Sequence, residues 1–188
     1  MDFKGGFKSE GMTNEDLKSK IRSIENWPKQ GVIFRDITPV LEDKNLFGFL
    51  VDSLAKLCQG KKIDKIVGID ARGFIFASAL AYKLGVGLAI VRKKGKLPGK
   101  TIGRRYSLEY AANTLQMHED SIKSGEKVLI CDDVLATGGT VSATIDIIKQ
   151  LGGEIAGLLF FIELIDLGGR GKLMSPEGGP QIDSLIKF

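Results

Sequence analysis

The sequence is poor in the residues that build disulfide frameworks and metal sites. Its 188 residues include two cysteines, Cys58 and Cys131, and a single histidine, His118. Two cysteines this far apart fit neither a disulfide framework nor a zinc-binding spacing, and the histidine has no partner at a ligand spacing. We therefore expect free thiols in a reducing compartment, with the cytoplasm as the location of the protein.

Long hydrophobic runs are also missing. The longest apolar run covers the eight residues 155–162, whereas a membrane span needs about 20. The start of the chain lacks the apolar segment of a secretory signal. With 43% hydrophobic and 27% charged residues, the composition is that of a globular protein with a core. We expect no membrane partner, a flexible arm at residues 1–12 and a single domain at residues 13–188.

Acidic residues are absent from residues 92–105. This segment holds seven lysines and arginines, whereas the whole chain has a net charge of +4, so the remainder has a net charge of −3. One basic segment on an acidic body is a poor match for a protein that coats nucleic acid, and no aromatic residue interrupts the segment. We therefore expect no nucleic-acid partner. The basic segment is interpreted either as a site that attracts a small polyanion or as a solvated loop.

Apolar segments without strict alternation are interleaved with helical patterns along the chain. We predict strands at residues 65–69, 88–91, 127–131 and 155–164, and helices at residues 14–25, 45–59, 73–84 and 140–151. The first of these helices begins at a capping box formed by Thr13 and Asp16, and residues 29–44 are expected to be irregular. The pattern predicts an α/β fold with a mostly parallel twisted sheet and helices on both faces.

Ligands bind at the carboxyl ends of the strands in such sheets. The strand predicted at 127–131 is followed by Asp132, Asp133 and the turn Ala136–Thr140, which leads into a helix. Amide groups at a helix N-terminus favour a phosphate, and glycines let it approach the backbone closely. The two carboxylates would repel a phosphate, so we expect them to meet sugar hydroxyls and a bridging divalent cation. The alternative is an ordinary strand end with a capped helix.

Residues 128–140, VLICDDVLATGGT, resemble the motif with which type I phosphoribosyltransferases bind phosphoribosyl pyrophosphate (PRPP). The Leu-Ala-Thr turn resembles that of the adenine phosphoribosyltransferases in particular. Other segments resemble this family in the same order: GVIFRDITP the adenine-binding hood, ARGFIF the pyrophosphate loop, and KGKLP with YSLEY the mobile flap. The resemblance implies the type I phosphoribosyltransferase fold, a small N-terminal hood at about residues 27–40 and a flap at about residues 93–118.

The implied reaction is transfer of the phosphoribosyl group of PRPP to adenine, which gives AMP and pyrophosphate in purine salvage. The resemblance also implies a homodimer, for which the helix faces around Phe47 and Phe76 are candidates. Mg²⁺ would be bound through PRPP, with no direct protein ligand assigned. One alternative is a phosphoribosyltransferase for hypoxanthine, guanine or xanthine, and another is a regulatory protein that senses PRPP.

The resemblance further implies roles for individual residues. PRPP or AMP would be bound by Arg72, Arg92, Lys93, Lys96, Tyr110, Asp132, Asp133, Ala136, Thr137, Gly138, Gly139 and Thr140. Phe34 would stack on the purine, and the backbone of Ile33 and Arg35 would read its edge. Glu109 would act as general acid or base, with Asp132 and Asp133 as the other catalytic candidates. The glycine-rich tail after Leu167 matches less well, and no role is expected for it.

Overall fold

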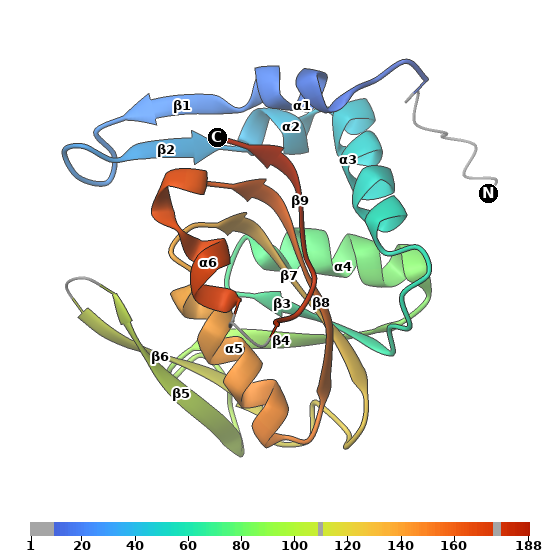
Figure 1. Ribbon diagram of the computed structural model, residues 1–188, viewed down its shortest axis with the longest axis vertical. Coiled ribbons are helices and arrows are strands. Elements are labelled where there is room, and N and C mark those ends of the chain that lie inside the picture. The colour runs from blue at the N-terminus through green and yellow to red at the C-terminus, as the bar shows by residue number, and fades with distance from the viewer. Residues whose placement is uncertain (1–9, 109–110, 175–177) are drawn as a thin grey trace. The chain divides into compact units, whose positions relative to one another are not determined.

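The computed structural model describes residues 10–108, 111–174 and 178–188 (Figure 1). The chain forms two compact units, Met1–Lys56 and Leu57–Phe188. No helix within these described ranges is both long enough and apolar enough to cross a bilayer.

The first unit combines helices with a small antiparallel sheet. Its elements are α1 (Asn14–Lys20), β1 (Arg22–Glu25), β2 (Ile33–Asp36), α2 (Thr38–Glu42) and most of α3 (Lys44–Leu57). The predicted capping box of α1 is confirmed, since Thr13 and Asp16 bond to each other's backbone amides. The amphipathic helix predicted at 45–59 is confirmed as α3.

Two predictions for this unit are wrong. The helix expected at 14–25 ends at Lys20, and the segment expected to be irregular contains β2 and α2. Residues 22–25 are extended because they pair with β2, with Arg22 opposite Asp36 and a 2.7 Å ion pair between these two side chains. Pairing with a distant segment has overridden the local helical periodicity.

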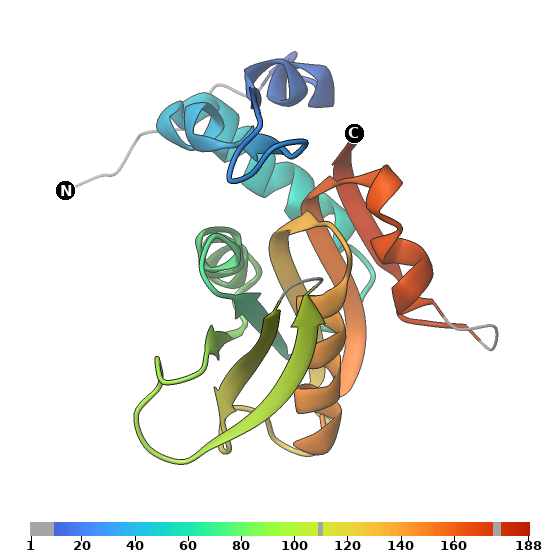
Figure 2. The same cartoon turned by 90° about the vertical axis from the view of Figure 1, so that its left-hand side faces the viewer.

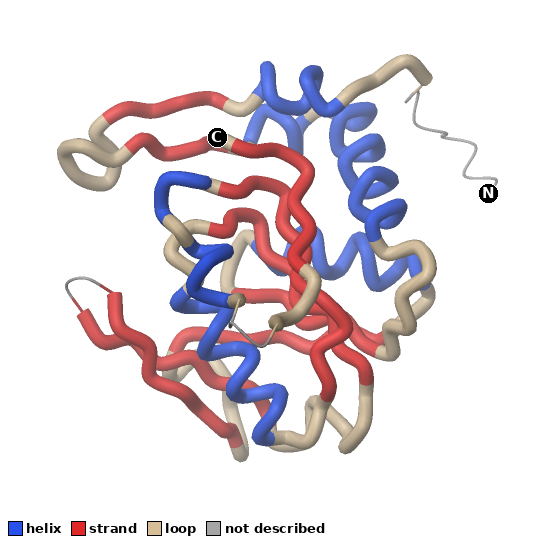
Figure 3. The backbone as a smooth tube through the Cα atoms, in the orientation of Figure 1, coloured by secondary structure: helices blue, strands red, loops and turns tan. Residues whose placement is uncertain are grey.

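The second unit is built on a seven-stranded sheet with the order β5-β6-β4-β3-β7-β8-β9. Figure 3 shows its strands in red and helices in blue. The elements are β3 (Lys65–Ile69), α4 (Gly73–Leu84), β4 (Gly87–Lys93), β5 (Thr101–Leu108), β6 (Ala111–His118), β7 (Lys127–Leu135), α5 (Gly139–Gln150), β8 (Glu154–Glu163), η1 (Ile165–Leu167), α6 (Gly169–Leu173) and β9 (Ile182–Lys187). Strands β4, β3, β7, β8 and β9 are parallel, and the hairpin of β5 and β6 is added antiparallel to β4. The predicted mostly parallel sheet is confirmed.

Helices α4 and α5 cover opposite faces of this sheet (Figure 2). On one face, Val67 and Ile130 belong to the same buried cluster as Ile147 of α5. On the other face, Phe76 of α4 packs against Phe161 of β8 with ring centroids 5.9 Å apart. Both faces of the central strands are therefore buried, which explains why their sequences do not alternate.

This packing overturns one expectation about assembly. Phe76 is 0% exposed, so its side chain is a core element and is not available for a subunit contact. The face around Phe76 is therefore wrong as a candidate dimer surface, whereas Phe47 of α3 is half-buried.

Candidate functional site

The predicted site residues of the second unit gather where parallel strands end. Strands β4, β3 and β7 are parallel neighbours, so their carboxyl ends lie along one edge of the sheet (Figure 1). Arg72 follows β3, Arg92 lies at the end of β4, and the turn Ala136–Gly138 follows β7. This edge is where an α/β sheet of this kind binds its ligands.

The turn Ala136–Gly138 leads directly into α5. Gly138 has a left-handed backbone with φ of 75°, and no side chain within the described part of the chain caps the helix. The amide groups of its first turn are therefore left for a ligand, and the helix dipole adds a partial positive charge there. Thr137 is exposed and Thr140 is half-buried, so two hydroxyls stand beside these amides. This arrangement suits a phosphate group.

Asp132 is a buried carboxylate within strand β7. The strand continues to Leu135, four residues beyond the predicted end, because it stays paired with β8. The Asp132 side chain accepts a hydrogen bond from the amide of Asp133 at 2.9 Å. A Cβ atom at Gly73 would lie 2.7 Å from its Oδ1 atom, so α4 begins directly against this carboxylate. Burial, together with the charge of Asp133, raises the pKa of Asp132 well above its ordinary value.

Asp133 is also buried, with 6% of its surface exposed. Its Oδ2 atom lies 2.7 Å from Nε of Arg72. Among the described residues that oxygen has no hydrogen-bond partner despite this ion pair. Burial raises the pKa of Asp133, while the positive charge of Arg72 opposes that rise. Arg72 therefore pairs with a buried carboxylate, not with a partner on the surface.

The basic segment after β4 is anchored at its base and exposed beyond it. Nε of Arg92 lies 3.3 Å from Oδ2 of Asp70, and its Nη1 donates a hydrogen bond to the carbonyl of Lys96 at 3.1 Å. The side chains of Lys93 and Lys96 are exposed. Positive charge is therefore available to a ligand at this edge, because Arg92 is held in place and the side chains of Lys93 and Lys96 are exposed.

Side chains from β6 hold the loop between β4 and β5. Gln116 accepts a hydrogen bond from the amide of Gly95 at 2.8 Å and donates one to Thr101 at 3.0 Å. Nε2 of His118 lies 2.8 Å from the carbonyl of Pro98. Backbone bonds hold the two ends of the loop, from the amide of Lys94 to Thr114 and from the amide of Glu119 to Lys100. Between its ends the loop is therefore held at separate points by single side-chain bonds.

Two predicted site residues, Glu109 and Tyr110, lie outside the described residues. The strands on either side of them pair in register, from Thr101 opposite His118 to Leu108 opposite Ala111. The roles of Glu109 and Tyr110 stay predictions.

The predicted base-binding residues Ile33, Phe34 and Arg35 lie on β2 in the first unit. The ring of Phe34 meets that of Trp27 edge-on, with centroids 4.4 Å apart. Trp27 is 51% exposed and Ile33 is 47% exposed, so this aromatic pair stands at a surface and Phe34 is not a core residue. Trp27 was not among the predicted site residues, although its place at the start of the hood segment was a usable signal.

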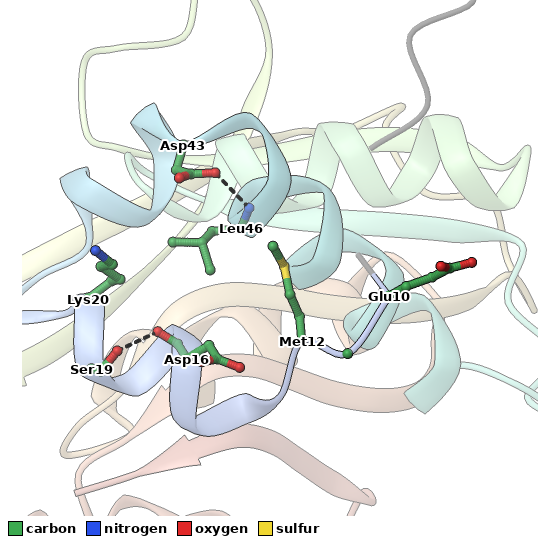
Figure 4. Close-up of a pocket in the computed structure, with 8 residues that line it drawn as sticks. Glu10, Met12, Asp16, Ser19, Lys20, Asp43 and Leu46 are labelled. Atoms are coloured by element: carbon green, nitrogen blue, oxygen red, sulfur yellow. Dashed lines mark hydrogen bonds between the residues drawn. The ribbon is translucent and has the colours of Figure 1, made fainter. Parts of the chain in front are cut away.

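A separate cavity of about 390 Å³ lies in the first unit (Figure 4). It is lined by Glu10, Gly11, Met12, Asp16, Ser19, Lys20, Asp43 and Leu46. Two of its carboxylates serve helix ends: Asp16 closes the capping box of α1, and Asp43 accepts amide hydrogen bonds from Asn45 and Leu46. These bonds lower the pKa of Asp16 and of Asp43. The cavity is acidic and two of its three carboxylates are engaged at helix ends, so we assign it no part in the site.

The described residues contain no cluster of three or more potential metal ligands from histidine, cysteine, aspartate or glutamate. Asp132 and Asp133 offer carboxylate oxygens, and Oδ2 of Asp133 has no hydrogen-bond partner among the residues described. Such oxygens suit Mg²⁺, which often takes one or two carboxylates and completes its shell with substrate phosphates and water. The donor set therefore fits a metal that arrives with its substrate.

Comparison with known proteins adds to this geometry. Residues 40–171 match the phosphoribosyl transferase domain family. An adenine phosphoribosyltransferase of Clostridium botulinum is 52% identical over 173 residues, which cover 92% of this chain and 98% of that protein. The crystal structure of an adenine phosphoribosyltransferase from Thermoanaerobacter pseudethanolicus has a TM-score of 0.90 and 46% identity, covering 94% of this chain and all of that one. The Saccharomyces cerevisiae enzyme, complexed with an imino-altritol bisphosphate and adenine, has a TM-score of 0.84 and 35% identity over 92% of this chain and 97% of that one.

Proposed function

The chain belongs to the phosphoribosyl transferase family, and we propose that it transfers the phosphoribosyl group of PRPP to adenine, giving AMP and pyrophosphate. One observation carries this proposal: the buried Asp132–Asp133 pair lies at the end of β7, just before a turn whose helix has no side-chain cap among the described residues. The relatives that share about half of its residues are adenine phosphoribosyltransferases. Transfer to hypoxanthine, guanine or xanthine is not favoured.

In this proposal the turn Ala136–Thr140 holds the 5′-phosphate. Its support is the free N-terminus of α5 and the two hydroxyls of Thr137 and Thr140. Backbone amides fixed by the fold need no reorganisation when the anion arrives, which makes such a cradle effective.

Asp132 and Asp133 would bind the ribose hydroxyls. In the reaction the bond from the anomeric carbon to pyrophosphate breaks, a bond to a purine nitrogen forms, and that nitrogen loses its proton. Positive charge builds on the sugar ring as pyrophosphate leaves. A buried carboxylate near the ring stabilises that charge, because the low dielectric of the interior strengthens the interaction.

Arg72, Arg92, Lys93 and Lys96 would surround the pyrophosphate. Arg72 and Arg92 are each oriented by an acidic partner, whereas the lysines supply charge from an exposed segment. Mg²⁺, when bound, would neutralise the leaving group, and Asp132 and Asp133 are the residues that fit its preference for oxygen ligands.

The base would bind to the hood segment at residues 27–40. Phe34 would stack on the purine, with Trp27 fixing the Phe34 ring edge-on. Backbone groups of Ile33 and Arg35 would read the base edge, since a flat ring alone does not discriminate purines. Glu109, on the proposed flap at residues 93–118, would accept or donate the purine proton.

We also propose a cytoplasmic homodimer. Cys58 and Cys131 are buried and neither forms a disulfide within the described part of the chain, which suits a reducing compartment. The face around Phe47 remains the candidate for the subunit contact.

The decisive experiment is a base panel with the purified protein. Product formation from PRPP and Mg²⁺ should occur with adenine and not with hypoxanthine, guanine or xanthine. Turnover of guanine without turnover of adenine would overturn the base assignment. PRPP binding with no product from any base would favour the regulatory alternative.

A paired variant tests the acidic residues. Asp132→Asn with Asp133→Asn should lower kcat by about 100- to 1,000-fold, because charge stabilisation in the transition state is lost. The matched control is Asp146→Asn on the exposed side of α5, which should leave kcat unchanged. An unaffected double variant would exclude the pair from the reaction.

A further inference from the structure

The short helix α6, in the tail for which no role was expected, packs against the turn Ala136–Gly138. A Cβ atom built on Gly169 would lie 2.1 Å from the carbonyl oxygen of Ala136 and 3.1 Å from the amide nitrogen of Gly138. From the other side, a Cβ atom on Gly138 would lie 3.0 Å from the carbonyl oxygen of Gly169. The two backbones are therefore in direct contact, and no side chain fits between them at residue 169.

An ion pair between Arg170 and the buried Glu163 holds α6 in this place. Arg170 forms two hydrogen bonds to Glu163, from Nε at 2.7 Å and from Nη2 at 2.6 Å. Its Nη1 also donates to the carbonyl of Ile182 at 3.0 Å, and Ser184 donates to Glu163 at 2.6 Å. The Glu163 side chain is 6% exposed and that of Arg170 is 38% exposed. A two-point pair of this kind fixes both distance and orientation.

Glu163 is itself tied to the start of the turn. It is the last residue of β8 and lies opposite Leu135 of β7, the residue that precedes Ala136. The adjacent amide of Leu164 donates to the carbonyl of Leu135 at 2.9 Å. Thus β8 holds the beginning of the turn, and Arg170 links that same strand end to the helix that supports the rest of it.

We propose that Gly169 and Arg170 are positioning residues that hold the 5′-phosphate turn in its binding geometry through α6. This inference rests on the proposed function, in which residues 136–140 bind the 5′-phosphate of PRPP. Neither residue is required to touch the substrate. They act by fixing the backbone of Ala136 and Gly138. Without the contact to α6, that backbone could shift away from its binding geometry.

The first test compares two glycines of the same short helix. Gly169→Ala should raise the KM for PRPP by about 10- to 100-fold, as expected when binding groups are displaced by about 1 Å, and leave the KM for adenine unchanged. Gly171→Ala is the matched control, because a Cβ atom there meets nothing within 4 Å. Equal KM values for PRPP in the two variants would overturn the proposal.

The second test uses Arg170, whose side chain is 38% exposed and outside the apolar core. Arg170→Ala should weaken binding of ribose 5-phosphate, measured by calorimetry, and Arg170→Lys should restore part of it because lysine keeps the charge but loses the two-point fork. If Gly169→Ala does not fold, this series decides. Unchanged ribose 5-phosphate affinity in Arg170→Ala would overturn the positioning role.

The ribose 5-phosphate measurement also separates the two proposals. If the wild-type protein does not turn over adenine but both variants bind ribose 5-phosphate more weakly than Gly171→Ala does, the positioning role stands and the base assignment fails. If adenine turnover is normal in all variants and the affinities agree, the positioning role fails and the proposed function stands.

Discussion

The turn after β7 and the loop after β4 occupy equivalent places in the sheet but are held in opposite ways. The turn Ala136–Gly138 is packed against the backbone of α6. A Cβ atom added to Gly138 would lie 3.0 Å from the carbonyl oxygen of Gly169. The loop at residues 94–100 has two glycines with positive φ, Gly95 and Gly99, around which a Cβ atom meets nothing within 4 Å. Backbone bonds join its two ends to β6 and the residue after it, from the amide of Lys94 to the carbonyl of Thr114 and from the amide of Glu119 to the carbonyl of Lys100. Between these ends its attachments are single side-chain bonds from Arg92, Gln116 and His118.

The difference follows from what each segment would do. A group that stays on the substrate throughout the reaction, the 5′-phosphate, is best held by a preorganised cradle. A leaving group must be enclosed and then released, which suits a segment that opens and closes. The free space around Gly95 and Gly99 and the exposed lysines are consistent with such a segment.

The largest expected effect comes from placing the same substitution in both segments. Gly138→Ala should raise the KM for PRPP by about 100-fold, because the new methyl group meets Gly169 and the left-handed backbone costs a further 1–2 kcal/mol or so. Gly99→Ala is matched in backbone, with φ of 76° against 75° for Gly138, and should show only the backbone cost in urea unfolding. Similar KM values in the two variants would break the comparison.

The next effect concerns the carboxylate beside the rigid turn. Because burial raises the pKa of Asp132 above its ordinary value of 3.8, the folded state binds its proton more tightly than the unfolded state. Stability from this group therefore falls as the pH rises above 3.8. Asp132→Asn should raise the free energy of unfolding at pH 7, measured by urea denaturation, because the amide carries no charge to bury, while activity is lost. A destabilised variant would contradict this.

A smaller effect tests whether the support of the turn depends on pH. The hydrogen bonds from Arg170 lower the pKa of Glu163 from 4.5 to about 2, so the pair stabilises the fold above about pH 4.5 and this contribution is lost as the pH falls toward 2. Because Arg170 is partly exposed, we expect about 1.5 kcal/mol rather than the full value of the shift. Arg170→Ala should flatten the pH dependence of unfolding in this window, and an unchanged profile would exclude the pair as its source.

The smallest effect addresses the loop. Gln116→Ala removes the two hydrogen bonds to Gly95 and Thr101 and should lower the free energy of unfolding by about 1 kcal/mol. Limited proteolysis should then cut residues 94–100 faster, whereas Arg170→Ala should leave that rate unchanged. Faster cutting in both variants would mean that the turn and the loop are not held independently.

The sequence predicted best the central strands, which are buried on both faces of the sheet, and the helices that cover them. Strand β3 and helix α4 have the bounds that the sequence predicted, because their apolar residues are placed by local periodicity and by burial in one core. Strands β1 and β2 were not predicted, since they exist by pairing with each other. Strand β5 carries Arg104 and Arg105 and reads as a loop until its partner β6 is known.

The candidate site divides in the same way. Asp132, Asp133 and the turn are contiguous in sequence, so their chemistry was visible as a motif. Arg72 was assigned through resemblance, but its buried partner Asp133 became visible only with the structure. Gly169 and Arg170 act on the turn from more than 30 positions away and carry no motif, so no pattern in the sequence indicated them.

The contact between Gly169 and Ala136 has a consequence for protein design. The proposed phosphate-binding turn cannot be moved to another protein by itself, because it packs against a helix that the chain reaches only after β8. A design that transfers residues 132–140 to another protein must also supply equivalents of Gly169 in α6 and of Glu163 at the end of β8. Without them we expect the backbone of the turn to change shape.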